Sequence, residues 1–191
     1  EVKKKNLQLA YCSDAGMPGI SDPGALLVQA SYLESVPVTV LPGPTASLSA
    51  LVLSGIDSAD FTFFGFLPTK KGAIKEMLAE HKDRKETLIY YESPKRVKAT
   101  LAIMMEVFGE EREVSLIREL TKIHEEVVHG TLKELNENLV DEVKGECVIV
   151  IKGNTEAKKE LSDDELKKLI KKSLKEGKTL SEAVKELQKD T

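Results

Sequence analysis

A glycine- and proline-rich loop near the start of the chain most constrains the fold. Residues 11–24 read Tyr-Cys-Ser-Asp-Ala-Gly-Met-Pro-Gly-Ile-Ser-Asp-Pro-Gly and lie between a strand-like apolar run and a helix-like segment. Glycine permits positive φ angles and a close approach of the backbone to a ligand, and Asp22 can cap a helix that Pro23 opens. Because α/β proteins bind ligands where a strand hands over to a helix, this loop is the first candidate site. Its spacing matches neither GxGxxG nor a P-loop, which argues against a standard dinucleotide or triphosphate site.

Strand and helix patterns alternate along residues 7–153, which predicts an α/β fold with a parallel sheet covered by helices. The expected strands are 7–12, 36–41, 61–66, 87–91, 114–117, 126–129 and 147–151. The expected helices are 23–34, 45–54, 72–81, 94–108 (with Ser93 as N-cap), 131–139, 161–175 and 180–188. A phenylalanine-rich strand at 61–66 opens a second unit. We therefore expect the remainder of an N-terminal α/β domain at 1–60, a C-terminal α/β domain at 61–153 and a helical tail at 154–191.

Composition indicates a soluble globular protein. The chain is 41% hydrophobic and 31% charged, and its longest apolar runs fall far short of the roughly 20 residues that cross a bilayer. Cys12 and Cys147 lie in strand-like segments, which suits a reducing cytoplasm, and both are expected to be small core residues. The three histidines are too scattered to suggest a metal site. A net charge of −4 is weak evidence against nucleic-acid binding, because charge near the site counts more than the total.

Three later motifs also follow expected strands. They are Leu-Pro-Gly-Pro-Thr-Ala-Ser at 41–47, Tyr-Tyr-Glu-Ser-Pro-Lys-Arg at 90–96 and Arg-Glu-Leu-Thr-Lys-Ile-His-Glu-Glu at 118–126. Together with the first loop they closely resemble the tetrapyrrole methylase superfamily, and within it the family of ribosomal RNA small subunit methyltransferase I. The resemblance covers residues 7–153 and, weakly, the tail. It implies a two-domain class III methyltransferase fold that holds its cofactor between the two units.

The resemblance also implies an activity and its partners. Members of this family methylate a cytidine 2′-hydroxyl in small-subunit (16S) ribosomal RNA with S-adenosylmethionine, release S-adenosylhomocysteine, use no metal and act as cytoplasmic homodimers. The implied cofactor contacts are Asp14, Ala15, Gly16, Met17, Pro18, Ser21, Thr45, Ala46 and Glu92. The implied substrate contacts are Ser93, Lys95, Arg96 and Arg118. Thr45 and Ala46 match the position where the superfamily binds the methionine carboxylate at a helix start, and Arg96 suits a phosphate.

Residues 118–126 hold the catalytic candidates Glu119, Lys122 and Glu125. A ribose hydroxyl is a poor nucleophile, so a carboxylate that accepts its proton and an ammonium that stabilises the alkoxide would help. A spacing of three and three predicts one face of a helical turn. A surface ion-pair cluster is the alternative interpretation, and His124 is a secondary candidate.

Other functions stay open at this stage. A tetrapyrrole carbon or the modified histidine of an elongation factor (a diphthine-type acceptor) would use the same scaffold and cofactor, although the charged segments 90–96 and 118–126 favour RNA. The family normally begins with a strand and a loop of the form GTPIGNLxD, which does not precede Glu1. We therefore expect a partial first domain, and an inactive scaffold is the non-enzymatic alternative.

Overall fold

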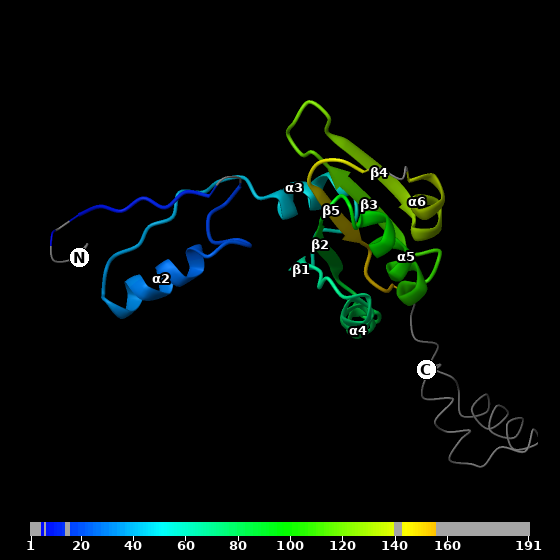
Figure 1. Ribbon diagram of the computed structural model, residues 1–191, viewed down its shortest axis with the longest axis horizontal. Coiled ribbons are helices and arrows are strands. Elements are labelled where there is room, and N and C mark those ends of the chain that lie inside the picture. The colour runs from blue at the N-terminus through cyan, green and yellow to red at the C-terminus, as the bar shows by residue number, and fades with distance from the viewer. Residues whose placement is uncertain (1–4, 6, 14–15, 140–142, 156–191) are drawn as a thin grey trace, which may run out of the picture. The chain divides into compact units, whose positions relative to one another are not determined.

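The computed structural model describes residues 5, 7–13, 16–139 and 143–155 (Figure 1). Contacts divide the chain into two units, Glu1–Gly153 and Asn154–Thr191. The helices expected at 161–175 and 180–188 lie outside the described residues, as do Asp14 and Ala15. The domain boundary near residue 60 stays a prediction. Within the described ranges, none of the helices combines the length and apolar character that a membrane crossing requires.

A five-stranded mixed sheet of order β1-β2-β5-β3-β4 forms the centre of the first unit. Its strands are β1 (Phe61–Phe66), β2 (Thr87–Glu92), β3 (Glu113–Arg118), β4 (Glu126–Thr131) and β5 (Cys147–Ile151). β1 and β2 are parallel, whereas β2–β5, β3–β5 and β3–β4 are antiparallel. The expectation of a parallel sheet thus holds for one pair. A loop as short as that between β3 and β4 can join only antiparallel neighbours.

Helices cover both faces of this sheet (Figure 1). α4 (Lys71–His81), α5 (Val97–Phe108) and α6 (Leu132–Asn138) share one apolar core with the sheet, and α3 (Ala46–Ser54) shares a second core with the opposite face. Alternation along β2 shows the division: Leu88 and Tyr90 belong to the first core, Ile89 to the second. A capping box between Thr131 and Glu134 begins α6.

The two N-terminal strands expected from the sequence are absent from the described residues. Segments 7–12 and 36–41 have no regular secondary structure and pair with no strand there. A strand requires a hydrogen-bonded neighbour. Cys12 is accordingly exposed rather than in a core, while Cys147 is buried as expected. α2 (Gly24–Leu33), which lies between these segments, begins one residue after Pro23.

α5 also begins later than expected. Its N-cap is Arg96, not Ser93. The Ser93 carbonyl accepts hydrogen bonds from the N–H groups of Arg96 and Val97, at 2.9 and 3.1 Å, so residues 93–96 form a turn before the helix. The Glu92 carboxylate accepts the Ser93 N–H at 2.6 Å and fixes this turn.

Candidate functional site

Three strands end and two begin at the same end of the sheet. In register, Glu92 of β2 and Arg118 of β3 lie on either side of Cys147, the first residue of β5. On the far side of β2, Phe66 pairs with Tyr91. The turns that follow β1, β2 and β3 therefore leave together, and we call this the site end. Motifs 90–96 and 118–126, far apart in sequence, both lie there.

The start of α3 reaches the site end through Tyr91. The Ser47 N–H donates to the Tyr91 hydroxyl at 3.1 Å. Thr45, the N-cap, has an extended backbone, and its carbonyl accepts the Ser49 N–H at 3.0 Å. The Thr45 Oγ1 atom is buried and has no hydrogen-bond partner within the described residues. A helix start with an unsatisfied buried hydroxyl suits a polar or anionic ligand group.

The first glycine-rich loop lies beside this helix start. A Cβ atom added to Gly16 would lie 3.6 Å from the Pro44 carbonyl oxygen, and one added to Gly43 would lie 3.6 Å from Met17 Sδ. Gly16 has a φ angle of 74°, a left-handed conformation that suits glycine. Two of the predicted cofactor motifs thus meet, and half-buried Pro18 continues the same loop.

Asp22 holds the second half of this loop. Its Oδ1 accepts hydrogen bonds from the N–H groups of Gly19 and Gly24, at 2.8 and 2.7 Å. Its Oδ2 is buried without a partner among the described residues, a signal that sequence reasoning missed. Ser21 has a left-handed φ of 61°, and its Oγ lies 3.8 Å from where a Cβ on Gly65 would stand, so the loop also reaches β1.

The sequence predicts that Glu92 contacts the cofactor and that Arg96 binds a phosphate. In the structure, these two side chains bind each other. The Glu92 side chain is 0% exposed and accepts from Arg96 Nε at 2.8 Å and from Thr100 Oγ1 at 2.7 Å. Arg96 also donates to the carbonyls of Leu67 and Pro68, at 3.1 and 2.9 Å. The pair therefore clamps the β1–α4 turn to the β2–α5 turn. Neighbouring Ser93 is half-buried and Lys95 is exposed.

The catalytic candidates lie in the β3–β4 loop, not on the helical turn that their spacing predicted. Glu119 and Thr121 have left-handed φ angles of 51° and 63°, which store strain in residues other than glycine. Lys122 Nζ lies 2.9 Å from Glu119 Oε1 and 3.1 Å from Glu146 Oε2. The hydrogen bond between Lys122 and Glu119 lowers the pKa of Glu119 and raises the pKa of Lys122. Glu125 instead accepts the Thr121 N–H at 2.6 Å.

Glu119 also anchors this loop to the start of β5. Its Oε1 accepts the Glu146 N–H at 3.0 Å, and its own N–H donates to the Glu146 carbonyl at 3.0 Å. Gly145 leaves room for the Glu119 side chain, because an added Cβ would lie 2.2 Å from Glu119 Cδ. Arg118 pairs with Glu126 across the β3–β4 pair, and His124 is exposed.

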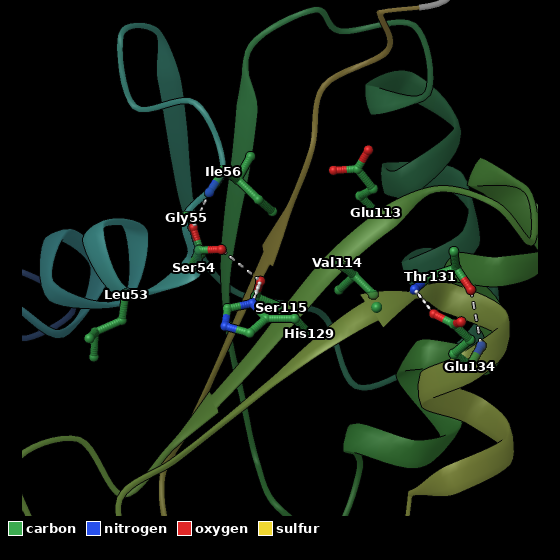
Figure 2. A pocket seen from close by; sticks show the side chains of 11 residues that line it. Leu53, Ser54, Gly55, Ile56, Glu113, Val114, Ser115, His129, Thr131 and Glu134 are labelled. Carbon is green, nitrogen blue, oxygen red and sulfur yellow. Dashed lines mark hydrogen bonds between the residues drawn. The ribbon is translucent and has the colours of Figure 1, made fainter.

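A separate cavity of about 510 Å³ lies toward the opposite end of the sheet (Figure 2). The end of α3, the start of β3 and the end of β4 line it, and Ser115 Oγ lies 2.8 Å from His129 Nδ1. No predicted site residue falls in this cavity. Among the described residues, no group of three His, Cys, Asp or Glu side chains could hold a metal ion.

Comparisons with known proteins agree with the motifs. The family model described as Tetrapyrrole (Corrin/Porphyrin) Methylases matches residues 1–136. A protein of Streptococcus pyogenes serotype M3 named Ribosomal RNA small subunit methyltransferase I is 40% identical over 184 residues, covering 95% of this chain and 64% of that protein. The protein of the same name from Bacillus subtilis (strain 168) is 39% identical over 196 residues, covering 97% and 65%. The chain thus spans about 64% of the length of these curated relatives.

Solved structures show the same fold. The methyltransferase CobJ matches with a TM-score of 0.55 at 18% identity, covering 73% of this chain and 62% of its own. Uroporphyrin-III-C-methyltransferase from Thermus thermophilus matches with a TM-score of 0.53 at 19% identity, covering 72% and 60%. These likenesses confirm the predicted mixed α/β methylase fold, and with the family model they establish the relationship. The chain belongs to the tetrapyrrole (corrin/porphyrin) methylase family.

Proposed function

We propose that the protein containing this chain transfers a methyl group from S-adenosylmethionine to a cytidine 2′-hydroxyl in small-subunit ribosomal RNA. The observation that carries this proposal is the 40% identity, over 95% of the chain, to a protein named Ribosomal RNA small subunit methyltransferase I. The meeting of loops 16–24 and 41–47 and the gathering of motifs 90–96 and 118–126 at the site end support it.

The residues at the start of α3 fit the polar part of this cofactor. When bound, S-adenosylmethionine supplies an electrophilic methyl group and carries a carboxylate, an amino group and a ribose. The first turn of α3 offers N–H groups and a positive dipole end to the carboxylate, and the unpartnered Thr45 Oγ1 can donate to it. We assign Thr45 and Ala46 to that group, and residues 14–18 with Ser21 to the rest of the cofactor.

The cluster in the β3–β4 loop would act on the acceptor. Lys122 carries a positive charge and its hydrogen bond to Glu119 raises its pKa further, so it can stabilise negative charge that develops on the ribose oxygen. Glu119 holds Lys122 in place through the hydrogen bond that also lowers the pKa of Glu119. The proton would pass to a carboxylate of this loop, Glu119 or Glu125.

The RNA would approach along the basic side chains of the site end. We propose that Lys70, Lys95, Arg96 and Lys122 follow one RNA path in a cytoplasmic homodimer, with Ser93 and Arg118 beside it. Phosphate contacts release counterions, so RNA affinity should fall steeply as salt rises. In α2, the side chains of Leu26, Tyr32 and Leu33 are 68–82% exposed, which is consistent with a further interface. Light scattering tests the dimer.

Methyl transfer to small ribosomal subunits that lack the modification tests the function. Mass spectrometry of nuclease digests should place the methyl group on a cytidine 2′-oxygen. Thr45→Val, which removes only the unpartnered hydroxyl, should raise KM for S-adenosylmethionine by about 10-fold, the equivalent of one hydrogen bond of about 1.4 kcal/mol. Ser31→Ala is the matched control, since that hydroxyl donates within its own helix, to the Leu27 carbonyl. A folded protein that binds the cofactor but methylates no ribosomal RNA would refute the proposal.

A further inference from the structure

Positive charge gathers in the two turns that lead into α4 and α5. Residues 69–75 and 93–98 each contain three basic side chains and no acidic one, in a chain whose net charge is −4. The six basic residues are Lys70, Lys71, Lys75, Lys95, Arg96 and Lys98. Because β1 and β2 are parallel neighbours, each followed by its helix, both turns lie at the site end and both helices begin there. The two helix dipoles add further positive potential.

A cavity separates the beginnings of these two helices. It measures about 430 Å³, and Thr69, Lys71, Ile74, Arg96, Ala99, Thr100, Ala102 and Ile103 line it. Its α5 wall includes two alanines, whose small side chains leave the space open. The hollow is therefore flanked by Lys71 and Arg96. Positive charge on both sides suits a strand with charged phosphates.

The basic side chains of these turns differ in how strongly they are bound by other groups of the protein. Arg96 is held by Glu92 and two backbone carbonyls and so fixes the two turns relative to each other. Lys71 lies 3.9 Å from Glu106, but its side chain is 72% exposed, so that pair is weak. Lys70 and Lys95 are exposed and form no ion pair with any described residue. The two exposed lysines are thus available to an anionic partner.

We infer that residues 69–75 and 93–98, the α4–α5 surface, bind backbone phosphates of the RNA substrate. The inference rests on the proposed function and identifies where the RNA is held outside the methyl-transfer site. The α4–α5 surface lies on the face of the sheet opposite α3, yet at the same end, so a strand that crosses this end reaches both. Lysines act on phosphate as point charges and read no sequence, so this surface contributes affinity and orientation.

The expected magnitude follows from counterion release. One contact to a single-stranded phosphate changes the slope of log K against log salt by about 0.7, which corresponds to about 5-fold in affinity at 0.1 M salt relative to 1 M. Replacing Lys70 and Lys95 together should therefore weaken RNA binding by about 25-fold and reduce the slope by about 1.4.

The test compares two double variants of the protein containing this chain. Lys70→Ala/Lys95→Ala removes two charges from the α4–α5 surface, and Lys82→Ala/Lys85→Ala removes two exposed charges beyond the other end of α4. Fluorescence anisotropy with a ribosomal RNA fragment that contains the target should show the 25-fold loss for the first variant only.

Unchanged affinity and unchanged salt slope in Lys70→Ala/Lys95→Ala would overturn the inference, as would an equal loss in the control variant. Weaker binding to whole subunits with normal binding to naked RNA would assign the surface to an acidic ribosomal protein, which also overturns it. If the unaltered protein methylates no RNA but the two lysines still govern salt-dependent RNA binding, the proposed function fails and this surface stands.

Discussion

Replacing Arg96 by alanine should destabilise the fold by about 3 kcal/mol, because it leaves the buried carboxylate of Glu92 without its positively charged partner. The Glu92 side chain is 0% exposed and would keep only two neutral donors, the Ser93 N–H and the Thr100 hydroxyl. Removing one partner of a buried ion pair costs about 3–5 kcal/mol. The Arg96 side chain is 28% exposed, so water can partly replace it, which favours the lower end of that range.

Urea unfolding measures this loss. With a slope of about 2 kcal/mol per M, the midpoint should fall by about 1.5 M. Glu92→Gln in the Arg96→Ala background should recover part of the stability, because it removes the stranded charge. The urea midpoint of Arg96→Lys should lie between those of the parent protein and Arg96→Ala. Lysine keeps the positive charge but cannot donate several hydrogen bonds in the geometry of a guanidinium. If Arg96→Ala unfolds within 0.5 kcal/mol of the parent, on the order of a neutral surface substitution, and loses RNA affinity instead, the guanidinium is a phosphate ligand and the clamp argument is wrong.

Three further predictions concern other parts of the structure. Glu119→Gln or Lys122→Ala should abolish methyl transfer and leave cofactor affinity, measured by calorimetry, within a few-fold; equal loss of both would assign the cluster to folding. Gly145→Ala should lower the free energy of unfolding in urea by about 1–3 kcal/mol, because φ is 85° and the new Cβ meets Glu119. Adding Glu119→Ala should relieve the contact but not the backbone strain. Full recovery of stability in that double variant would contradict the backbone argument. Burial is the larger cause, and the positive charge of Arg84 the next, of a His81 pKa below the usual 6.5. The unfolded chain therefore binds the proton at a higher pH than the folded chain does. The free energy of unfolding should fall as pH drops from 7 to 5. His81→Phe should flatten that fall, and an unchanged pH slope would refute the assignment.

The C-terminal half of the first unit was predictable from the sequence because its elements are defined by local patterns. The strands β1 to β5 and the helices α4 and α6 begin and end within two residues of their expected bounds. The prediction of strands at 7–12 and 36–41 was wrong because an apolar run becomes a strand only when a neighbour pairs with it. Sequence periodicity does not identify that neighbour.

The motifs at the site end were predictable as a set, but their contacts were not. Glycine and proline mark the loops by their own backbone preferences, so loops 16–24 and 41–47 were found from sequence. The bond between Ser47 and Tyr91 joins residues 44 apart, and no local pattern encodes it. The spacing of Glu119, Lys122 and Glu125 predicted a helical turn, whereas left-handed φ angles at Glu119 and Thr121 give a tight loop.

The last two residues of β2 connect the two proposed ligand sites. Successive side chains of a strand point to opposite faces, so Tyr91 points toward α3 and holds its start, while Glu92 points toward α5 and holds Arg96. Tyr91→Phe removes one hydrogen bond, worth about 1 kcal/mol, and should raise KM for S-adenosylmethionine by about 5-fold without changing RNA affinity. Glu92→Gln should loosen the α4–α5 surface and weaken RNA binding first. If both variants changed the two affinities equally, the sheet would not separate the cofactor side from the RNA side, and the assignment of α3 and the α4–α5 surface to different ligands would be wrong.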